Sequence, residues 1–178
     1  MKLLTISLVV ILSSLLMACG GTPNTVEPGA LTVNVKNLRQ VEKNVYSSGQ
    51  PTKEQLEMLK ELGIKHIVNL RPAAEMDWNE SELVGQLGMT YHSIPVAGGR
   101  DITHKNATLL QETLVNIGDQ PVLVHCSSGN RIGSLIAVDQ YMSQQKSIDA
   151  AIDEGKRWGL TRNENPVRAI LDKMERPK

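Results

Sequence analysis

The stretch of sequence that decides the fold runs from residue 121 to residue 134 and reads PVLVHCSSGNRIGS. Its first part, Pro121 to Cys126, is short and almost wholly apolar, which is typical of a strand buried on both faces of a parallel sheet. An apolar helical pattern with Ile132, Leu135 and Ile136 follows directly. A buried strand that leads through a short loop into a helix start predicts a ligand site at that turn.

The residue types in this loop indicate which ligand the site would take. Backbone N–H groups at a helix start lack partners and attract an anion, and a cysteine placed there, such as Cys126, is expected to be a thiolate at neutral pH. Gly129 permits the loop to curl until its amides converge on an oxyanion, and the planar guanidinium of Arg131 can bind two oxygens of a phosphoryl group. We therefore predict Cys126 and Arg131 as catalytic residues, with a phosphate-binding loop made of His125, Ser127, Ser128, Gly129 and Asn130.

Small side chains in the loop leave room for a substrate. Ser127 and Ser128 do not block the approach to Cys126, and their hydroxyls are suited to stabilise a departing thiolate. We expect His125 to orient the loop through hydrogen bonding rather than to act as a base.

The N-terminus has the features of a bacterial export signal. Residues 1–18 carry one positive charge, Lys2, and a short apolar stretch that is too short to span a bilayer. Cys19, followed by two glycines, resembles the lipobox of lipoproteins, where the cysteine is acylated and becomes the first residue; an uncut anchor helix is the alternative. We expect a lipoprotein signal peptide over 1–18, lipidation of Cys19, and a protein held through this anchor on the periplasmic face of a membrane of the cell envelope.

Composition narrows the classes of partner and site. The 178 residues hold 19 basic and 19 acidic side chains, so no long-range field recruits nucleic acid. Lipidation of Cys19 would leave Cys126 as the only thiol, which excludes an internal disulfide and favours a reactive cysteine. The four histidines and the single remaining thiol lack metal-ligand spacing, so we predict no metal and no cofactor. The oligomeric state is not indicated by the sequence.

Strand-like and helix-like segments alternate along the rest of the chain. Residues 19–36 are expected to be a flexible tether, and residues 37–178 one domain. The alternation predicts an α/β fold with a mainly parallel central sheet flanked by helices, in which ligands bind at the carboxyl ends of the strands. The segments expected to meet at that edge are 48–51, 71–78, 97–103 and 126–131.

Several phrases resemble a known family. The loop is similar to the HCxxGxxR signature of protein tyrosine and dual-specificity phosphatases, and the phrases YSSGQP (46–51), VNLR (68–71) and AIDEG (151–155) resemble bacterial members of that group. More narrowly, residues 41–160 look like the phosphatase-like domain named after a β-lactamase hydrolase-like protein. The resemblance implies a cysteine-phosphatase-like fold and a phosphoric monoester hydrolase that acts on a phosphorylated substrate through a phosphocysteine intermediate.

The spacing of the loop differs from the common signature. Four residues separate Cys126 from Arg131, where the common signature has five, and Ile132 stands at the usual place of the arginine. The narrower bacterial subgroup has the shorter spacing, and so do the loops of rhodanese-like sulfurtransferases. Two alternatives therefore remain open: sulfur transfer through a persulfide on Cys126, and a non-catalytic module that binds an anionic envelope component.

Phosphoryl transfer also needs a general acid to protonate the leaving group. The resemblance implies an aspartate on a loop upstream of the cysteine. Asp101 is our candidate, because it lies on a loop expected at the same edge of the sheet as Cys126. Its alternative role is to help cap the following helix, and Asp77 on the neighbouring loop is the second candidate.

Overall fold

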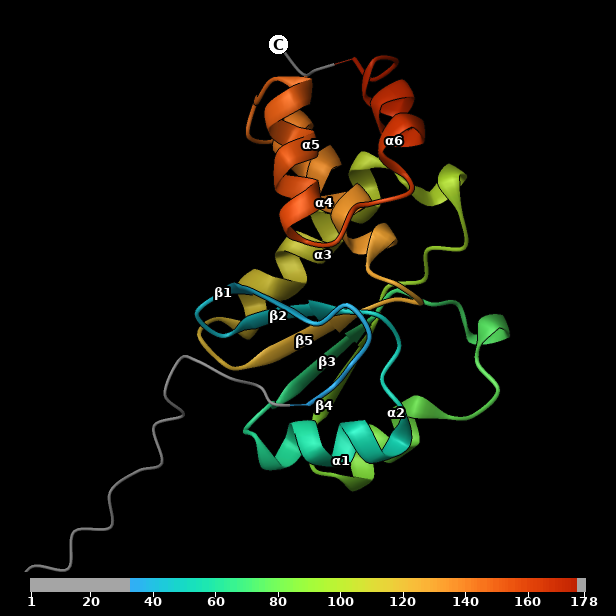
Figure 1. The fold of residues 1–178 in the computed structure, drawn as a ribbon, viewed down its shortest axis with the longest axis vertical. Helices are drawn as coiled ribbons and strands as arrows, with labels where there is room; N and C mark the ends of the chain where they lie inside the picture. The colour runs from blue at the N-terminus through green and yellow to red at the C-terminus, as the bar shows by residue number, and fades with distance from the viewer. Residues whose placement is uncertain (1–32, 176–178) are drawn as a thin grey trace, which may run out of the picture.

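The computed structural model describes residues 33–175, which form one five-stranded sheet with helices on both faces (Figure 1). The strand order is β1-β2-β5-β3-β4. The last four of these are parallel, and β1 joins β2 as an antiparallel edge. The predicted mainly parallel sheet is confirmed. The strands are β1 (Arg39–Glu42), β2 (Val45–Ser48), β3 (His66–Asn69), β4 (Thr90–Ser93) and β5 (Val122–His125).

Helices cover the sheet in two layers. Figure 1 shows α1 and α2 on one face and α3 to α6 on the other. Thr52 and Gln55 form a capping box at the start of α1, since they exchange side-chain and backbone hydrogen bonds. Thr103 caps α3 by accepting the Asn106 N–H. The helices are α1 (Lys53–Glu61), α2 (Glu80–Gln86), α3 (His104–Ile117), α4 (Asn130–Met142), α5 (Ile148–Arg157) and α6 (Glu164–Leu171), with 3-10 turns η1 (Ala73–Glu75) and η2 (Gly99–Asp101).

Each face of the sheet has its own hydrophobic core. In β5 every residue is buried, and the alternation of the strand sends Leu123 toward α1 and α2 and sends Val122 and Val124 toward α3 to α6. The same alternation points His125 and Cys126 to opposite faces. The strand that carries the loop is therefore fixed from both sides, as its apolar sequence predicted.

Helices α4 and α5 cross at two glycines. A side chain added to Gly155 would bring its Cβ within 2.6 Å of the Gly133 carbonyl oxygen, closer than real contacts allow. Neither position therefore tolerates a side chain without separating the helices. The crossing places the end of α5 against the start of α4, next to the Cys126 loop, where Gly159 packs against Gly129.

The folded domain begins earlier than expected. Val33 and Val35 are both 4% exposed and pack with Tyr46 and Leu56, and the Gly49 N–H donates to the carbonyl of Lys36 at 2.7 Å. Residues 33–36, assigned to the tether, are thus part of the domain, because two alternating valines suffice to bury one face of an extended segment. The rest of the tether, the signal peptide and Cys19 lie outside the described residues. Between residues 33 and 175, no helix has the length and apolar character needed to cross a bilayer.

Candidate active site

The predicted anion loop lies at the carboxyl end of β5. Its backbone curls back on the cysteine, so that the Gly129 N–H donates to Cys126 Sγ at 3.0 Å. Gly129 makes this turn with φ of 87°, a left-handed conformation that glycine adopts without strain, and it caps α4. The first N–H groups of α4 follow directly, as an anion site requires. The thiol is buried, since Cys126 is 0% exposed.

Neighbouring strand ends hold this loop in place. The Cys126 N–H reaches the Ser48 carbonyl at 3.4 Å, and the Leu70 N–H donates to the His125 carbonyl at 2.9 Å. Gly49 forms an isolated bridge with Ser128. The expected segment 48–51 thus adjoins the loop segment 126–131, and Glu75 in the expected segment 71–78 contacts Arg131.

Asn130 ties the other side of the loop to a segment that the sequence did not place at the site. Its side-chain Oδ1 accepts the N–H groups of Thr161 and Asn163 at 2.9 and 3.3 Å and the Thr161 hydroxyl at 3.2 Å. Its Nδ2 donates to Ser128 Oγ at 3.3 Å. The connection between α5 and α6 therefore buttresses the loop, and the Asn130 side chain serves the protein rather than a ligand.

Arg131 is only partly engaged. Its Nη2 donates to both carboxylate oxygens of Glu75, at 2.8 and 2.7 Å. Its Nη1 is buried and has no hydrogen-bond partner within residues 33–175. A buried donor without a partner costs about 1–3 kcal/mol, which an oxyanion in the loop would recover. The sequence predicted a guanidinium free to bind two oxygens. In the structure Glu75 holds its Nη2, and its Nη1 is available.

Arg71 has the opposite role. Its Nη1 donates to Gln50 Oε1 at 2.8 Å, its Nη2 donates to the Glu75 backbone carbonyl, and its Nε lies 3.5 Å from Glu75 Oε2. All three nitrogens therefore serve the protein. Arg71 fixes Glu75, and Glu75 in turn orients Arg131.

A second polar cluster lies behind the loop, on the α1 and α2 face. Ser48, His125 and Asn69 occupy the last positions of three adjacent strands and stand in register. Over them sits Glu80, which is 2% exposed and accepts the Asn69 Nδ2 at 2.7 Å. Its Oε2 also lies 3.1 Å from His125 Nε2. His125 was expected to orient the loop through hydrogen bonding, but neither of its ring nitrogens makes a hydrogen bond within residues 33–175, so its contact with Glu80 is one of proximity.

The two candidate acids lie on loops at the same edge of the sheet. Asp101 ends η2 and its Oδ2 accepts the Ala97 N–H at 2.7 Å, which closes its own loop. The cap of α3 is Thr103, so the carboxylate of Asp101 is not needed for that role, although its backbone carbonyl accepts the Asn106 side chain at 2.8 Å. Asp77 is exposed and lines a cavity of about 650 Å³ with Arg71. No hydrogen bond or ion pair found for residues 33–175 joins either carboxylate to Cys126.

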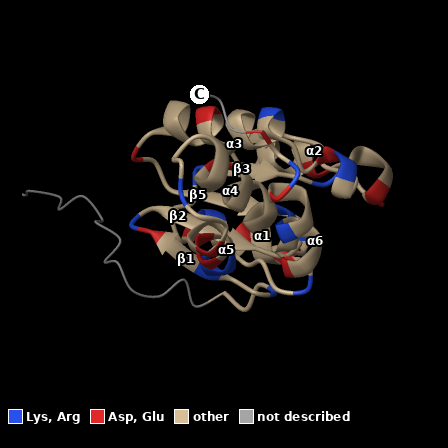
Figure 2. Cartoon of the chain, turned by 90° about the horizontal axis from the view of Figure 1, so that it is seen from above, with Lys and Arg blue, Asp and Glu red and all other residues tan. Residues whose placement is uncertain are grey.

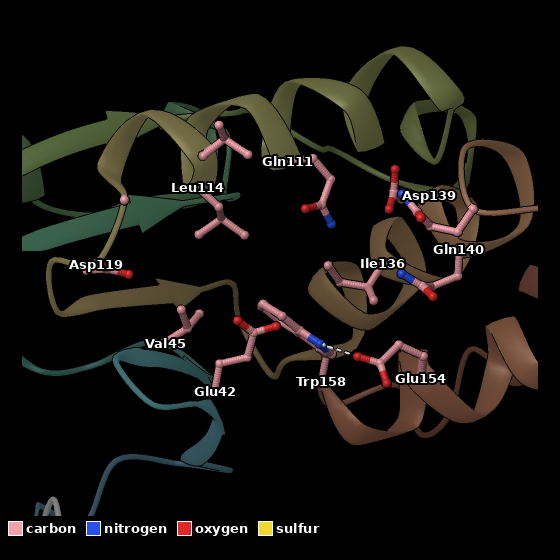
Figure 3. A pocket seen from close by; sticks show the side chains of 13 residues that line it. Glu42, Val45, Gln111, Leu114, Asp119, Ile136, Asp139, Gln140, Glu154 and Trp158 are labelled. Atoms are coloured by element: carbon pink, nitrogen blue, oxygen red, sulfur yellow. Dashed lines mark hydrogen bonds between the residues drawn. The ribbon is translucent and has the colours of Figure 1, made fainter. Parts of the chain in front are cut away.

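Another cavity, of about 390 Å³, is unsuited to a phosphate (Figure 3). None of its lining residues belongs to the Cys126 loop. Four carboxylates surround it, and burial raises the pKa of one of them, Asp139, while the hydrogen bond from Arg157 lowers the pKa of Glu154. The indole N–H of Trp158, which also lines this cavity, donates to Glu154 at 2.8 Å. The four carboxylates belong to Glu42, Asp119, Asp139 and Glu154. Their negative charges would repel an anion.

Charges are otherwise mixed over the molecule. Figure 2 shows acidic and basic residues side by side on the same helices rather than gathered on separate elements. A phosphorylated ligand would therefore be recognised locally, by the loop amides and Arg131.

Sequence reasoning missed the residues that support the loop. Gln50 and Asn69 stood inside phrases that were noticed only for their resemblance, and nothing in the sequence distinguishes Glu75 and Glu80 from ordinary surface acids. Their roles depend on contacts between segments far apart in the chain, such as the 56 residues that separate Glu75 from Arg131. A spacing rule does not reveal contacts of this kind.

Comparisons with known proteins agree with this geometry. The sequence model of the tyrosine phosphatase family matches residues 32–173. The chain is 29% identical over 118 residues to the β-lactamase hydrolase-like protein of Agrobacterium fabrum, covering 64% of this chain and 27% of that protein. It is 26% identical over 125 residues to the dual specificity protein phosphatase TpbA of Pseudomonas aeruginosa, covering 70% of this chain and 55% of that protein. The chain thus spans about a quarter and about half of these curated relatives.

A solved structure shares the fold. The core catalytic domain of the PP-IP phosphatase SIW14 of S. cerevisiae superposes with a TM-score of 0.62 at 23% identity, covering 79% of this chain and 87% of that one. At this level of identity the likeness concerns the fold. It supports the expected cysteine-phosphatase-like architecture.

Proposed function

We propose, from the premise that this chain belongs to the tyrosine phosphatase family, that it is a cysteine-dependent phosphatase that hydrolyses phosphomonoesters. The observation that carries the proposal is the loop that curls around Cys126, with the Gly129 N–H 3.0 Å from Sγ. An N–H donor at this distance stabilises a thiolate, which is the reactive form of cysteine. The adjacent start of α4 offers further N–H groups to an anion.

In the first step, the Cys126 thiolate attacks phosphorus. A sulfur–phosphorus bond forms as the bond between phosphorus and the ester oxygen breaks. The loop amides and the free Nη1 of Arg131 bind the non-bridging oxygens, while Glu75 keeps Nη2 and so fixes the plane of the guanidinium. Asp101 donates its proton to the leaving oxygen, with Asp77 as the alternative acid.

In the second step, water hydrolyses the phosphocysteine. The aspartate that gave up its proton takes one from the attacking water, so that an oxygen–phosphorus bond forms and the sulfur–phosphorus bond breaks. Inorganic phosphate leaves, and the thiolate and the protonated aspartate are restored. The cycle needs no metal and no cofactor.

Hydrolysis of an aryl phosphate by the reduced, purified domain tests this function. We expect Cys126→Ser to abolish phosphate release while phosphate or vanadate still binds, because the loop amides and Arg131 remain. Arg131→Ala should lose both, since the available guanidinium donor goes with it. Asp101→Asn should lower turnover of substrates with a poor leaving group much more than turnover of an aryl phosphate with a good one. The same selective loss in Asp77→Asn instead would identify Asp77 as the acid.

Two results would contradict the proposal. Transfer of sulfur from thiosulfate to cyanide without phosphate release would favour the sulfurtransferase reading of the four-residue loop. Saturable anion binding with no Cys126-dependent turnover would favour a binding module. Phosphorylated proteins and small phosphoesters both belong in the substrate panel, because the loop recognises the phosphoryl group alone.

The proposal includes attachment to the cell envelope. A lipid on Cys19 would hold the domain at the periplasmic face of a membrane, since about 0.8 kcal/mol is gained for each buried methylene group. Its support is the lipobox-like sequence at residues 16–19. Cell fractionation tests it: the full chain should sediment with membranes, Cys19→Ser should lose lipid labelling, and a wild-type chain without lipid would contradict it.

A further inference from the structure

Glu80 is a buried carboxylate in a place where the reaction does not obviously need one. It is the first residue of α2 and is 2% exposed. Its Oε1 accepts the Gln50 Nε2 and its Oε2 the Asn69 Nδ2, each at 2.7 Å. Both donors are neutral amides. A carboxylate removed from water is costly unless a positive charge or a proton accompanies it.

His125 is the third group in contact with this carboxylate. Its Nε2 lies 3.1 Å from Glu80 Oε2 without forming a hydrogen bond, and its side chain is 0% exposed. Two further titratable groups lie near the pair: Arg71 contacts Gln50 rather than Glu80, and the Tyr91 hydroxyl accepts Asn69 Nδ2 at 2.9 Å and interacts with Glu80.

The backbone passes any movement of His125 on to the nucleophile. Cys126 is the next residue, and its N–H is held by the Ser48 carbonyl. The His125 carbonyl accepts the Leu70 N–H. Backbone hydrogen bonds thus connect the ends of β2, β3 and β5. Glu80 connects the same strand ends through side chains.

We propose that Glu80 is a positioning residue for the nucleophile, which fixes the Cys126 loop through its contacts with Gln50, Asn69 and His125 at the ends of the strands that carry it. This inference rests on the proposed function of Cys126.

The test compares Glu80→Gln with Asn79→Ala. Glutamine keeps the size of the side chain and removes its charge. Asn79 is the adjacent residue and caps α2 by accepting the Glu82 N–H, so Asn79→Ala destabilises the same helix without touching His125. We expect Glu80→Gln to lower kcat/KM for an aryl phosphate by about 10- to 100-fold, as small misplacements of catalytic groups do. Alkylation of Cys126 by iodoacetamide in Glu80→Gln should also need a higher pH to reach the wild-type rate, because a displaced loop takes the Gly129 N–H away from Sγ. Asn79→Ala should leave this pH profile unchanged.

A double-mutant cycle tests whether Glu80 acts through His125. His125→Gln should shift the alkylation profile in the same direction, and the double variant should be no worse than the poorer single variant. Additive losses, or an alkylation profile that Glu80→Gln leaves in place, would overturn the inference. If Glu80→Gln does not fold, an unshifted profile in His125→Gln overturns it equally.

Alkylation does not depend on turnover. A wild-type protein that releases no phosphate would therefore refute the proposed function, while the shift between wild type and Glu80→Gln would still decide the role of Glu80.

Discussion

Two substitutions of Asn130 should separate the effect of the loop's stability from the effect of charge at the anion site. Its Oδ1 accepts three hydrogen bonds from Thr161 and Asn163, and the residue is 6% exposed. Asn130→Ala removes all three. At about 0.5–1.5 kcal/mol for each bond, and with water replacing part of the loss at the exposed segment, the free energy of unfolding should fall by about 1–3 kcal/mol. The loop should also lose its buttress, and kcat/KM for an aryl phosphate should fall with it.

Asn130→Asp should show the reverse pattern. A carboxylate keeps the acceptor for Thr161 and Asn163, and a negative charge in the first turn of α4 interacts favourably with the helix dipole. The free energy of unfolding should therefore stay within about 0.5 kcal/mol of the wild-type value or rise. The same charge stands beside the anion loop, where a repulsion of about 1–2 kcal/mol would weaken phosphate binding by about 5- to 30-fold.

Both variants are compared with the wild type in two measurements. Urea unfolding gives the free energy of unfolding, and phosphate inhibition of aryl phosphate hydrolysis gives the affinity for the anion. The reasoning predicts that Asn130→Ala loses chiefly stability and Asn130→Asp loses chiefly anion affinity. If Asn130→Ala unfolds at the wild-type urea concentration, the α5–α6 connection does not support the loop. If Asn130→Asp binds phosphate as the wild type does, the anion does not lie at the start of α4.

Two further predictions concern the scaffold. Gly155→Ala should lower the free energy of unfolding by about 1–3 kcal/mol through the clash with the Gly133 carbonyl. Gly85→Ala, in the last turn of α2 with open space around it, should raise the free energy of unfolding by about 0.5–1 kcal/mol. Equal effects of the two variants in urea unfolding would refute the close crossing of α4 and α5. Burial and the neighbouring His66, 3.2 Å away, lower the pKa of His92, so the unfolded chain takes up its proton first as the pH falls. Stability should therefore decrease below about pH 6.5, and His92→Gln should lessen the difference in Tm between pH 7.5 and pH 5.5; an unchanged difference would show that the pair does not contribute.

The sequence was sufficient where local chemistry determines structure. The apolar run before Cys126 predicted the central strand, and the loop residues predicted a turn that curls on the thiol. Each of these depends on residues within a few positions of one another. Fold class followed from their alternation, because parallel strands joined by helices have few arrangements.

The sequence was insufficient where tertiary contacts determine roles. The strand β1 has a single buried residue, Val41, and it gave no clear alternating signal. Val33 and Val35 stand in a stretch rich in turn-forming residues, so that only their burial against Tyr46 and Leu56 shows them to be part of the core. Glu75 and Glu80 acquire their roles from partners on other elements, which periodicity does not reveal.

These supporting contacts also bear on the short spacing between Cys126 and Arg131. With one residue fewer than the common signature, Arg131 falls in the first turn of α4, two residues after the capping Gly129. A guanidinium that starts from the helix needs an external partner to set its direction, and Glu75, itself fixed by Arg71, supplies one. The short loop likewise needs support from both sides, which Asn37 gives through the Ser128 carbonyl and Asn130 gives through Thr161. The four-residue spacing is therefore compatible with an ordered anion site, because contacts from distant segments fix what the loop alone does not.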